Sequence, residues 1–141
     1  MPALTNRLQN IRATGPVLEI LIGPSSTYLN TVQPTQVPPP VKALALIDTG
    51  ASMTVIRTGI AQQLGISPTG LTNIHTPSHA YIPCYQYDIG LNIPLFNINF
   101  ELVATEAHLQ GQPFGCLIGR DILSRAVFIY TGYDNSFTLA I

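Results

Sequence analysis

A single aspartate of this chain stands in a sequence context that suits acid–base chemistry. Asp48 follows the nearly continuous apolar run 41–47 and precedes the small residues Thr49, Gly50 and Ala51. A carboxylate at the end of an apolar strand is costly to bury without partners. The Thr49 hydroxyl can fix the turn, and Gly50 lets one backbone segment approach another closely. Such a turn would hold the acid rigidly in a poorly solvated place, which suits a general acid or base.

A family resemblance begins in this segment. Residues 46–52 read Leu-Ile-Asp-Thr-Gly-Ala-Ser, which resembles the active-site loop of the aspartic proteases, where Asp-Thr-Gly follows two apolar residues. Residues 116–123 read Cys-Leu-Ile-Gly-Arg-Asp-Ile-Leu, which is similar to the apolar-apolar-Gly-Arg-Asp/Asn segment near the C-terminus of the retroviral proteases. The resemblance covers about residues 15–141. It implies an aspartic endopeptidase, a hydrolase that cleaves a protein or peptide substrate, with Asp48 as its catalytic residue.

The resemblance also assigns roles to the residues around Asp48. The active-site loop would comprise Thr49, Gly50 and Ala51. The supporting strand and helix, which cross beneath that loop in the family, would contain Ile118, Gly119 and Arg120. In retroviral relatives an arginine at the position of Arg120 pairs with an acid four residues after the catalytic one, but that position holds Ser52 here. Arg120 is therefore expected to have a different partner.

One Asp-Thr-Gly in 141 residues has a consequence for assembly. The mechanism of the family needs two carboxylates that share one proton, because two like charges at close range cannot both ionise. We therefore expect a homodimer in which each subunit supplies one Asp48. A water between the two carboxylates would attack the peptide carbonyl, and Thr49 would reach across the two-fold axis to join the two loops. The resemblance implies no metal and no cofactor.

A hairpin over residues 72–87 corresponds in position to the flap that closes over substrate in the family. Its predicted flap and substrate-contacting residues are Ile74, His75, Thr76, Pro77, Ser78 and His79. The retroviral tip is rich in glycine, whereas this tip has none and carries a proline. A proline makes the backbone stiffer, so the opening of the flap and the range of substrates are expected to differ.

The elements that must position these residues are mostly strands. Twelve prolines and eleven glycines punctuate short apolar runs, which is typical of an all-β domain. We predict one domain over residues 1–141: a retropepsin-like closed β-barrel of one lobe, with a flap hairpin and one or two short helices. Residues 14–40 would hold the first strand, at 17–22, and an extended proline-rich loop, in which 38–40 could alternatively dock a proline-binding module.

Further elements follow from the apolar pattern. We predict a buried strand at 41–47 and a helix that Thr58 caps and Gly65 ends. The apolar parity changes after Pro94, which indicates a bulge or a turn between two strands within 91–102. The remaining predicted elements are a buried strand at 116–118, a helical turn or two at 119–124, and strands at 127–130 and 137–141.

Composition excludes several classes of function. Hydrophobic residues make up 46% of the chain and charged residues 9%, so disorder is excluded. The net charge of −1, with no run of either sign, gives no electrostatic surface for nucleic acid or an anionic membrane. We find no signal peptide and no membrane span, so a cytoplasmic location is the default expectation. Cys84 and Cys116 are expected to be free thiols.

Several alternatives stay open beside the active protease. The chain could be a catalytically silent protease-like module for dimerisation or peptide binding, or a plain all-β adhesion or ligand-binding domain. His75, His79 and Cys84 invite a metal site, but no fourth ligand is near them in the sequence. Met53 and Ile56 are assigned to the core, and Asp121 to a cap or dipole role at the start of a helix. The few charges near the expected cleft predict apolar side chains on both sides of the cleaved bond.

Overall fold

The computed structural model describes residues 1–75, 78 and 80–141, and within them the chain forms ten strands and four short α-helices. The strands are β1 (Ala3–Arg7), β2 (Val17–Pro24), β3 (Val41–Ile47), β4 (Val55–Arg57), β5 (Gly70–His75), β6 (Tyr81–Ile93), β7 (Ile98–Ala107), β8 (Cys116–Ile118), β9 (Val127–Thr131) and β10 (Ser136–Ala140). The helices are α1 (Ile11–Thr14), α2 (Ser26–Leu29), α3 (Ile60–Leu64) and α4 (Arg120–Leu123), with 3₁₀ turns at Pro34–Gln36 and Gly132–Asp134. No helix in the described part of the chain is long and apolar enough to cross a membrane.

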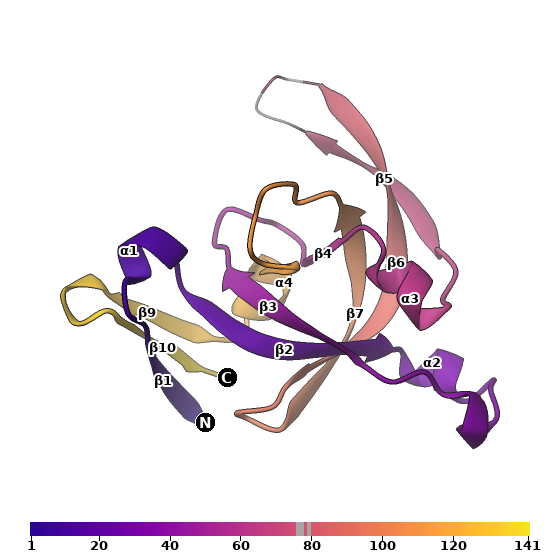
Figure 1. Ribbon diagram of the computed structural model, residues 1–141, viewed down its shortest axis with the longest axis horizontal. Helices are drawn as coiled ribbons and strands as arrows, with labels where there is room; N and C mark the ends of the chain where they lie inside the picture. The colour runs from indigo at the N-terminus through magenta and orange to yellow at the C-terminus, as the bar shows by residue number, and fades with distance from the viewer. Residues whose placement is uncertain (76–77, 79) are drawn as a thin grey trace.

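Six strands close into a barrel. They pair in the order β2-β3-β8-β4-β7-β6, and β6 pairs again with β2, so that Leu21 lies opposite Asn92 and Pro24 opposite Ile89 (Figure 1). Most neighbours are antiparallel, but β3 pairs with β8, and β4 with β7, in parallel. The predicted all-β closed barrel is therefore confirmed.

Alternating side chains build the interior of the barrel. Along β6, Tyr87, Ile89, Leu91 and Ile93 are buried, whereas the residues between them are exposed or half-buried. This is the period of two that a strand with one face on a core requires. The same alternation brings the side chains of Ala45 and Ile47 into the core at the end of β3. The core therefore fixes the position at which β3 delivers the next residue, Asp48.

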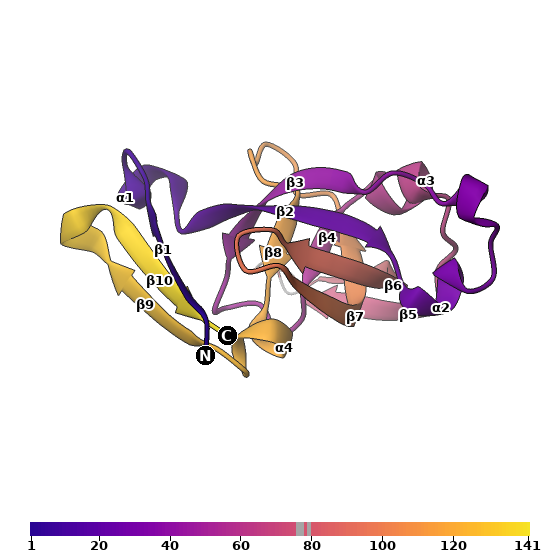
Figure 2. The ribbon, with the colours of Figure 1, turned by 90° about the horizontal axis from the view of Figure 1, so that it is seen from below.

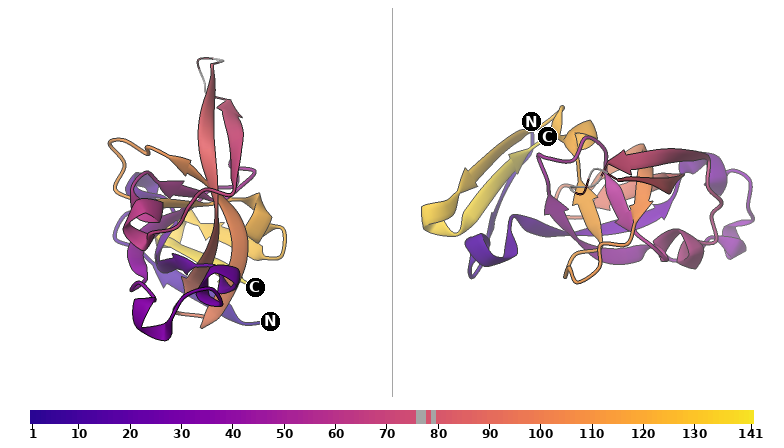
Figure 3. Two further views of the ribbon diagram at one scale, coloured as in Figure 1. Left: turned by 90° about the vertical axis from the view of Figure 1, so that its right-hand side faces the viewer. Right: turned by 90° about the horizontal axis from the view of Figure 1, so that it is seen from above.

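The predicted hairpin is formed by β5 and β6. Gly70 lies opposite Gln86 and His75 opposite Tyr81, whereas β6 pairs with β7 only from Gln86 onward. The distal part of the hairpin therefore stands away from the barrel, as Figures 1 and 3 show. The predicted turn at Thr76 and Pro77 lies outside the described residues.

A second, three-stranded sheet has the order β1-β10-β9 and lies at the end of the molecule opposite α2 and α3 (Figure 2). The prediction that the first strand lies at 17–22 is wrong, because β1 precedes it. Its composition, Ala-Leu-Thr-Asn-Arg, gives no apolar pattern, and pairing with β10 at the other end of the chain determines its place. Arg7 strengthens this pairing with a two-pronged ion pair to Asp134.

Two features of the N-terminal part of the chain differ from the prediction. The strand expected to stop before Gly23 continues to Pro24, because β6 offers a second pairing partner there. The connection expected to be an extended loop contains α2, whose first turn is capped by Ser25 and whose Ser26 N–H donates to the Glu101 carboxylate. The structure therefore adds α1 and α2 to the one or two helices expected.

The start of α3 also differs from the prediction. Gly59 is its N-cap residue, with φ +101° and no capping side chain, so the expected cap by Thr58 is wrong. The hydroxyl of Thr58 lies 3.4 Å from Nδ1 of His108 instead. The predicted end of the helix at Gly65, with φ +68°, is confirmed. The change of parity after Pro94 proves to be a turn between β6 and β7.

Candidate active site

The barrel holds Asp48 immediately beyond β3. Its backbone N–H donates to the Ile118 carbonyl at 2.9 Å, which ties it to β8, and its carbonyl accepts from Ala51 N–H at 3.2 Å. Its carboxylate oxygen Oδ1 accepts from Gly50 N–H at 2.9 Å. Asp48 is half-buried, whereas Thr49 and Gly50 are exposed. One carboxylate oxygen is therefore fixed by the backbone of its own loop, and the turn is open on its outer side.

Gly50 is suited to this turn because of space rather than backbone angle. A Cβ atom built on Gly50 would lie 3.1 Å from Oδ1 of Asp48, which is tighter than ordinary contact. Any side chain here would push against the carboxylate that the Gly50 N–H holds. The glycine therefore permits its N–H to approach the carboxylate closely, in agreement with the prediction of a close backbone approach at Gly50.

The supporting strand passes close beneath the loop. A Cβ atom on Gly119 would lie 2.5 Å from the Met53 carbonyl carbon and 2.9 Å from the Thr54 nitrogen, so only glycine fits without a shift of backbone. Beyond Gly119, the Arg120 N–H donates to the Ala51 carbonyl at 2.9 Å. The predicted supporting residues Ile118, Gly119 and Arg120 therefore all contact the active-site loop or the segment that follows it.

Arg120 has the partner that its sequence context left open. Its guanidinium Nη1 donates to the backbone carbonyl of Thr49, in the active-site loop, at 2.8 Å. The side chain thus reaches a backbone oxygen where the retroviral pattern has a carboxylate. Ser52, which stands at that carboxylate's position, is exposed.

Asp121 has a wider role than the predicted helix cap. Its Oδ1 does accept from the N–H of Ile122, at 3.0 Å, within α4. The same carboxylate also accepts from Thr54 N–H at 2.9 Å and from the Thr54 hydroxyl at 2.8 Å. Thr54 is fully buried, and its Oγ1 in turn accepts from Gly119 N–H at 3.3 Å. Asp121 therefore joins α4 to the end of the active-site loop.

A cleft of about 600 Å³ lies between the active-site loop and the hairpin. The loop contributes Gly50, Ala51, Ser52 and Met53, and the hairpin contributes Thr72, Asn73, Ile74 and His75. The rest of the wall is Val55, Thr105, Ala107, Leu109 and Leu117. None of these described lining residues is acidic, and most of the wall is apolar. The cleft therefore suits an extended chain with apolar side chains.

Of the six residues predicted for the flap, the structure describes Ile74, His75 and Ser78. Ile74 and His75 line the cleft, and the His75 ring stacks obliquely on Tyr81 with centroids 5.0 Å apart. Ser78 is exposed. Thr76, Pro77 and His79 lie outside the described residues.

Several cleft residues were not predicted from the sequence. Met53, assigned to the core, is half-buried and lines the cleft, whereas Ile56 is fully buried as expected. The signal was the alternation along the start of β4. Thr54 and Ile56 face inward, so Met53 and Val55 must face the other way. Leu109 and Leu117 carried no comparable signal, because their position depends on how the barrel closes.

The sequence matches one family along this region. The model of a protein family described as aspartyl protease matches residues 40–122, which run from just before β3 to α4 and include Asp48 and Arg120. No curated protein sequence matches the chain.

Solved structures extend the comparison to the fold. A retropepsin-like aspartic protease from Rickettsia conorii is 18% identical, covers 98% of this chain and 91% of its own, and has a TM-score of 0.54. The EIAV protease complexed with the inhibitor HBY-793 is 18% identical, covers 78% and 86%, and has a TM-score of 0.49. The retroviral protease-like domain of Ddi1 from Leishmania major is 15% identical, covers 86% of each chain, and has a TM-score of 0.47. The likeness to the Rickettsia protein shows that the fold is retropepsin-like.

Proposed function

Since this chain belongs to the aspartyl protease family, we propose that it hydrolyses peptide bonds as a homodimer in which each subunit supplies one catalytic Asp48. The observation that carries the proposal is a fixed carboxylate beside an apolar cleft. Asp48 is held by the Gly50 N–H at the exit of a barrel strand, and the cleft opens next to it under the hairpin.

The residues that line the cleft also support the proposal that a second subunit is required. General acid–base hydrolysis needs one carboxylate to take a proton from water and another to protonate the substrate carbonyl. None of the described residues that line the cleft is acidic, so Asp48, two residues before Gly50 in the cleft wall, has no second carboxylate in the lining. A two-fold axis beside Asp48 brings in the second carboxylate from an identical chain.

In the proposed mechanism, the ionised Asp48 of one subunit removes a proton from a water molecule held between the two carboxylates. The water oxygen attacks the peptide carbonyl carbon. The protonated Asp48 of the other subunit donates its proton to the carbonyl oxygen, and the tetrahedral intermediate collapses as a proton returns to the leaving amine. Arg120 holds the Thr49 carbonyl, so the loop keeps its shape while the proton moves.

The three-stranded sheet offers a surface for the second copy. Along the described residues, β9 pairs with β10 on one edge and with no strand on the other. Val127, Ile129 and Tyr130 on this edge strand are 49%, 53% and 49% exposed. An apolar strand with a free edge favours pairing with another chain. The end of β3, where Asp48 follows, lies toward the same end of the molecule (Figures 1 and 2).

The decisive experiment compares the wild type with Asp48→Asn. Both proteins are incubated with an unfolded protein mixture from acidic to neutral pH, and fragments are identified by mass spectrometry. We expect cleavage by the wild type and a loss of at least about a thousandfold in the variant. Sedimentation should show dimers for both proteins.

Asp88→Asn is the matched control. Asp88 is exposed on β6, and its carboxylate accepts a 3.4 Å hydrogen bond from the Thr69 hydroxyl. This variant should cleave like the wild type. Absence of cleavage by a folded, dimeric wild type would instead support the silent peptide-binding or dimerisation module. A wild type that stays monomeric at high concentration, yet cleaves, would contradict the shared pair.

A further inference from the structure

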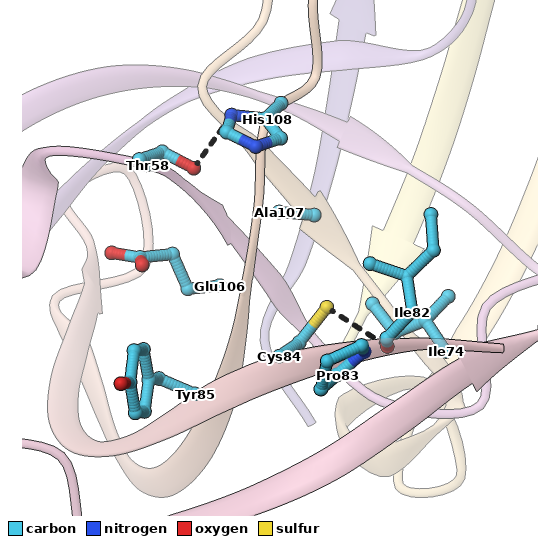
Figure 4. Close-up of a pocket in the computed structure, with 9 residues that line it drawn as sticks. All are labelled: Thr58, Ile74, Ile82, Pro83, Cys84, Tyr85, Glu106, Ala107 and His108. Atoms are coloured by element: carbon cyan, nitrogen blue, oxygen red, sulfur yellow. Dashed lines mark hydrogen bonds between the residues drawn. The ribbon is translucent and has the colours of Figure 1, made fainter.

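A second pocket, of about 410 Å³, lies at the base of the hairpin (Figure 4). It adjoins the cleft, because Ile74 and Ala107 line both. It forms where β6 and β7 separate: their pairing ends at Gln86 and Thr105, and the next residues of each strand border the gap. A peptide that occupies the cleft therefore has a side pocket within reach of its longer side chains.

The walls of this pocket differ in chemistry. Figure 4 shows Ile74, Ile82 and Cys84 on one side, with the Glu106 carboxylate and the Tyr85 ring on the other. The first side is apolar, and the second offers a negative charge beside an aromatic face. Such a pair of walls suits a ligand with an apolar stem and a cationic end.

Glu106 lacks a counter-ion of its own. Within the described residues, the ion pairs are Arg7 with Asp134 and Lys42 with Glu19, and neither includes the half-buried Glu106. The arginine of the paired strand β4, Arg57, donates instead to the carbonyls of Gln112 and Phe114. The charge of Glu106 therefore remains available to a ligand.

The negative charge of Glu106 also affects the pKa of a thiol that lines the pocket. Burial, and secondly the negative charge of Glu106, raise the pKa of the Cys84 thiol. A group that opposes the ionisation of a neighbouring thiol will favour an incoming cation. Salt will weaken the attraction, because the pocket is open to solvent.

We propose that this pocket binds the side chain of a lysine or arginine of the peptide substrate. The aliphatic stem packs on Ile74 and Ile82, and the charged end pairs with Glu106 and lies against the ring of Tyr85. This inference rests on the proposed function, since the peptide lies in the cleft. It adds a basic position, away from the cleaved bond, to the apolar preference of the cleft.

Two-fold symmetry implies two basic positions in the substrate, one on each side of the cleaved bond. Each subunit of the proposed homodimer supplies one such pocket, on either side of the shared carboxylates. The basic preference should therefore occur at one distance from the cleaved bond on its N-terminal side and at a corresponding distance on its C-terminal side. A substrate with basic residues at both positions should be cleaved best.

The test uses peptides built on a sequence that the full-length wild type cleaves. Lysine and its uncharged near-isostere norleucine are placed in turn at each position outside the two that flank the cleaved bond. We expect kcat/KM to be about five to ten times higher for lysine at one position on each side. This ratio of kcat/KM values should fall as the salt concentration is raised from about 0.05 to about 0.5 M, because salt screens the attraction between the lysine and the half-buried Glu106 carboxylate.

Substitutions of Glu106 test whether this residue causes the preference for lysine. In Glu106→Gln the lysine-to-norleucine ratio should fall to about one, and in Glu106→Lys a glutamate should replace lysine as the preferred residue. Glu101→Gln is the matched control, because Glu101 lies on the same strand but accepts from Ser26 N–H, away from this pocket. It should keep the wild-type ratio. The ratio compares two peptides on one protein, so a partly folded variant still gives a valid reading.

The outcomes separate this inference from the proposed function. If the wild type cleaves no peptide or protein, the proposed function fails and this inference fails with it. If the wild type cleaves but shows the same kcat/KM for lysine and norleucine at every position, the basic pocket alone is overturned. A lysine preference that persists in Glu106→Gln would also overturn it, because a group other than Glu106 would then bind the charged end of the lysine.

Discussion

The active-site loop (residues 48–54) and the distal hairpin (β5 with residues 81–85 of β6) border the same cleft but are held in different ways. The loop is tied to the barrel by backbone and carboxylate hydrogen bonds from β8 and α4. The distal hairpin is held by pairing between its own two strands. Leu71, Tyr81 and Tyr85 are 64%, 70% and 53% exposed there, whereas Thr54 in the loop is fully buried.

This difference matches the two tasks that the proposed function sets. A catalytic carboxylate must keep one geometry, so each polar group of its loop needs a fixed partner. A hairpin that covers substrate must move, so it should contribute little buried area to the barrel. The comparison predicts that substitutions beneath the loop alter stability and activity together. Substitutions on the hairpin should alter substrate binding alone.

The largest effect is expected beneath the loop, from Gly119→Ala. The added Cβ would lie 2.5 Å from the Met53 carbonyl carbon, so backbone must shift where β8 passes under the loop. We expect a loss of about 3 kcal/mol in the free energy of unfolding, together with loss of cleavage. Urea denaturation followed by circular dichroism measures the first quantity.

Gly23→Ala is the matched control for this prediction. Gly23 lies on β2, and a Cβ there would meet no atom within 4 Å. Its free energy of unfolding should change by less than about 0.5 kcal/mol. If Gly119→Ala is as stable as Gly23→Ala, the loop is not held by close packing on β8.

The two cysteines report on the two regions directly. Cys116 is fully buried in β8 under the loop, and Cys84 is half-buried on the hairpin. Burial raises the pKa of both thiols, so both should be mostly protonated near pH 8. Cys84 should still react with iodoacetamide at least about 100 times faster, because Cys116 must wait for the barrel to open.

The pH dependence of alkylation gives the sign of the Cys84 shift. Because the thiolate is the reactive form and its pKa is raised, the rate of Cys84 should keep increasing as pH rises above 9. Replacing Cys84 with serine identifies its contribution in a mass-spectrometric time course. Equal labelling rates for the two thiols would show that the strand beneath the loop opens as readily as the hairpin.

Asp121→Ala removes the hydrogen bonds that join α4 to the end of the active-site loop, and its effect on the free energy of unfolding should be intermediate. The change leaves the buried Thr54 N–H and hydroxyl without their acceptor. Unsatisfied buried donors cost about 2 kcal/mol in total, which we expect as a loss in the free energy of unfolding. Asp88→Ala, which removes an exposed carboxylate, should cost less than about 0.5 kcal/mol. Similar losses in the two variants would remove Asp121 from the support of the loop.

The same comparison explains which parts the sequence could predict. The active-site loop could be predicted because acid–base chemistry and a close backbone approach favour residues such as Asp48 and Gly50 at neighbouring positions. Its supporting strand, with Gly119, could be predicted only from the resemblance to the family. Barrel strands such as β3 could be predicted from continuous apolar runs, and the strands within 91–102 from the period of two that one buried face requires. The hairpin could be predicted from its two strand-like runs, without any knowledge of what its faces contact.

The remainder depends on contacts between distant segments. β1 was missed because its place is set by β10, and its own residues carry no apolar pattern. The partner of Arg120 could not be predicted either, because a backbone carbonyl leaves no mark on the sequence. Glu106 looked like an ordinary strand residue, and its position in a pocket follows from the point at which β6 and β7 separate.

The smallest effect is expected on the hairpin, from Ile74→Ala. Ile74 is half-buried and lines the cleft, while its strand, within the described part of the chain, pairs with β6 alone. Removing its side chain should raise KM about threefold to tenfold for an apolar peptide and leave kcat within about twofold, because substrate and transition state lose the same contact. The free energy of unfolding should change by less than about 1 kcal/mol. Asn73→Ala alters the neighbouring residue on the same strand, and its effect on KM for the same peptide should be smaller. A fall in kcat with unchanged KM in Ile74→Ala would mean that the hairpin shapes the transition state, and the division of tasks between loop and hairpin would then fail.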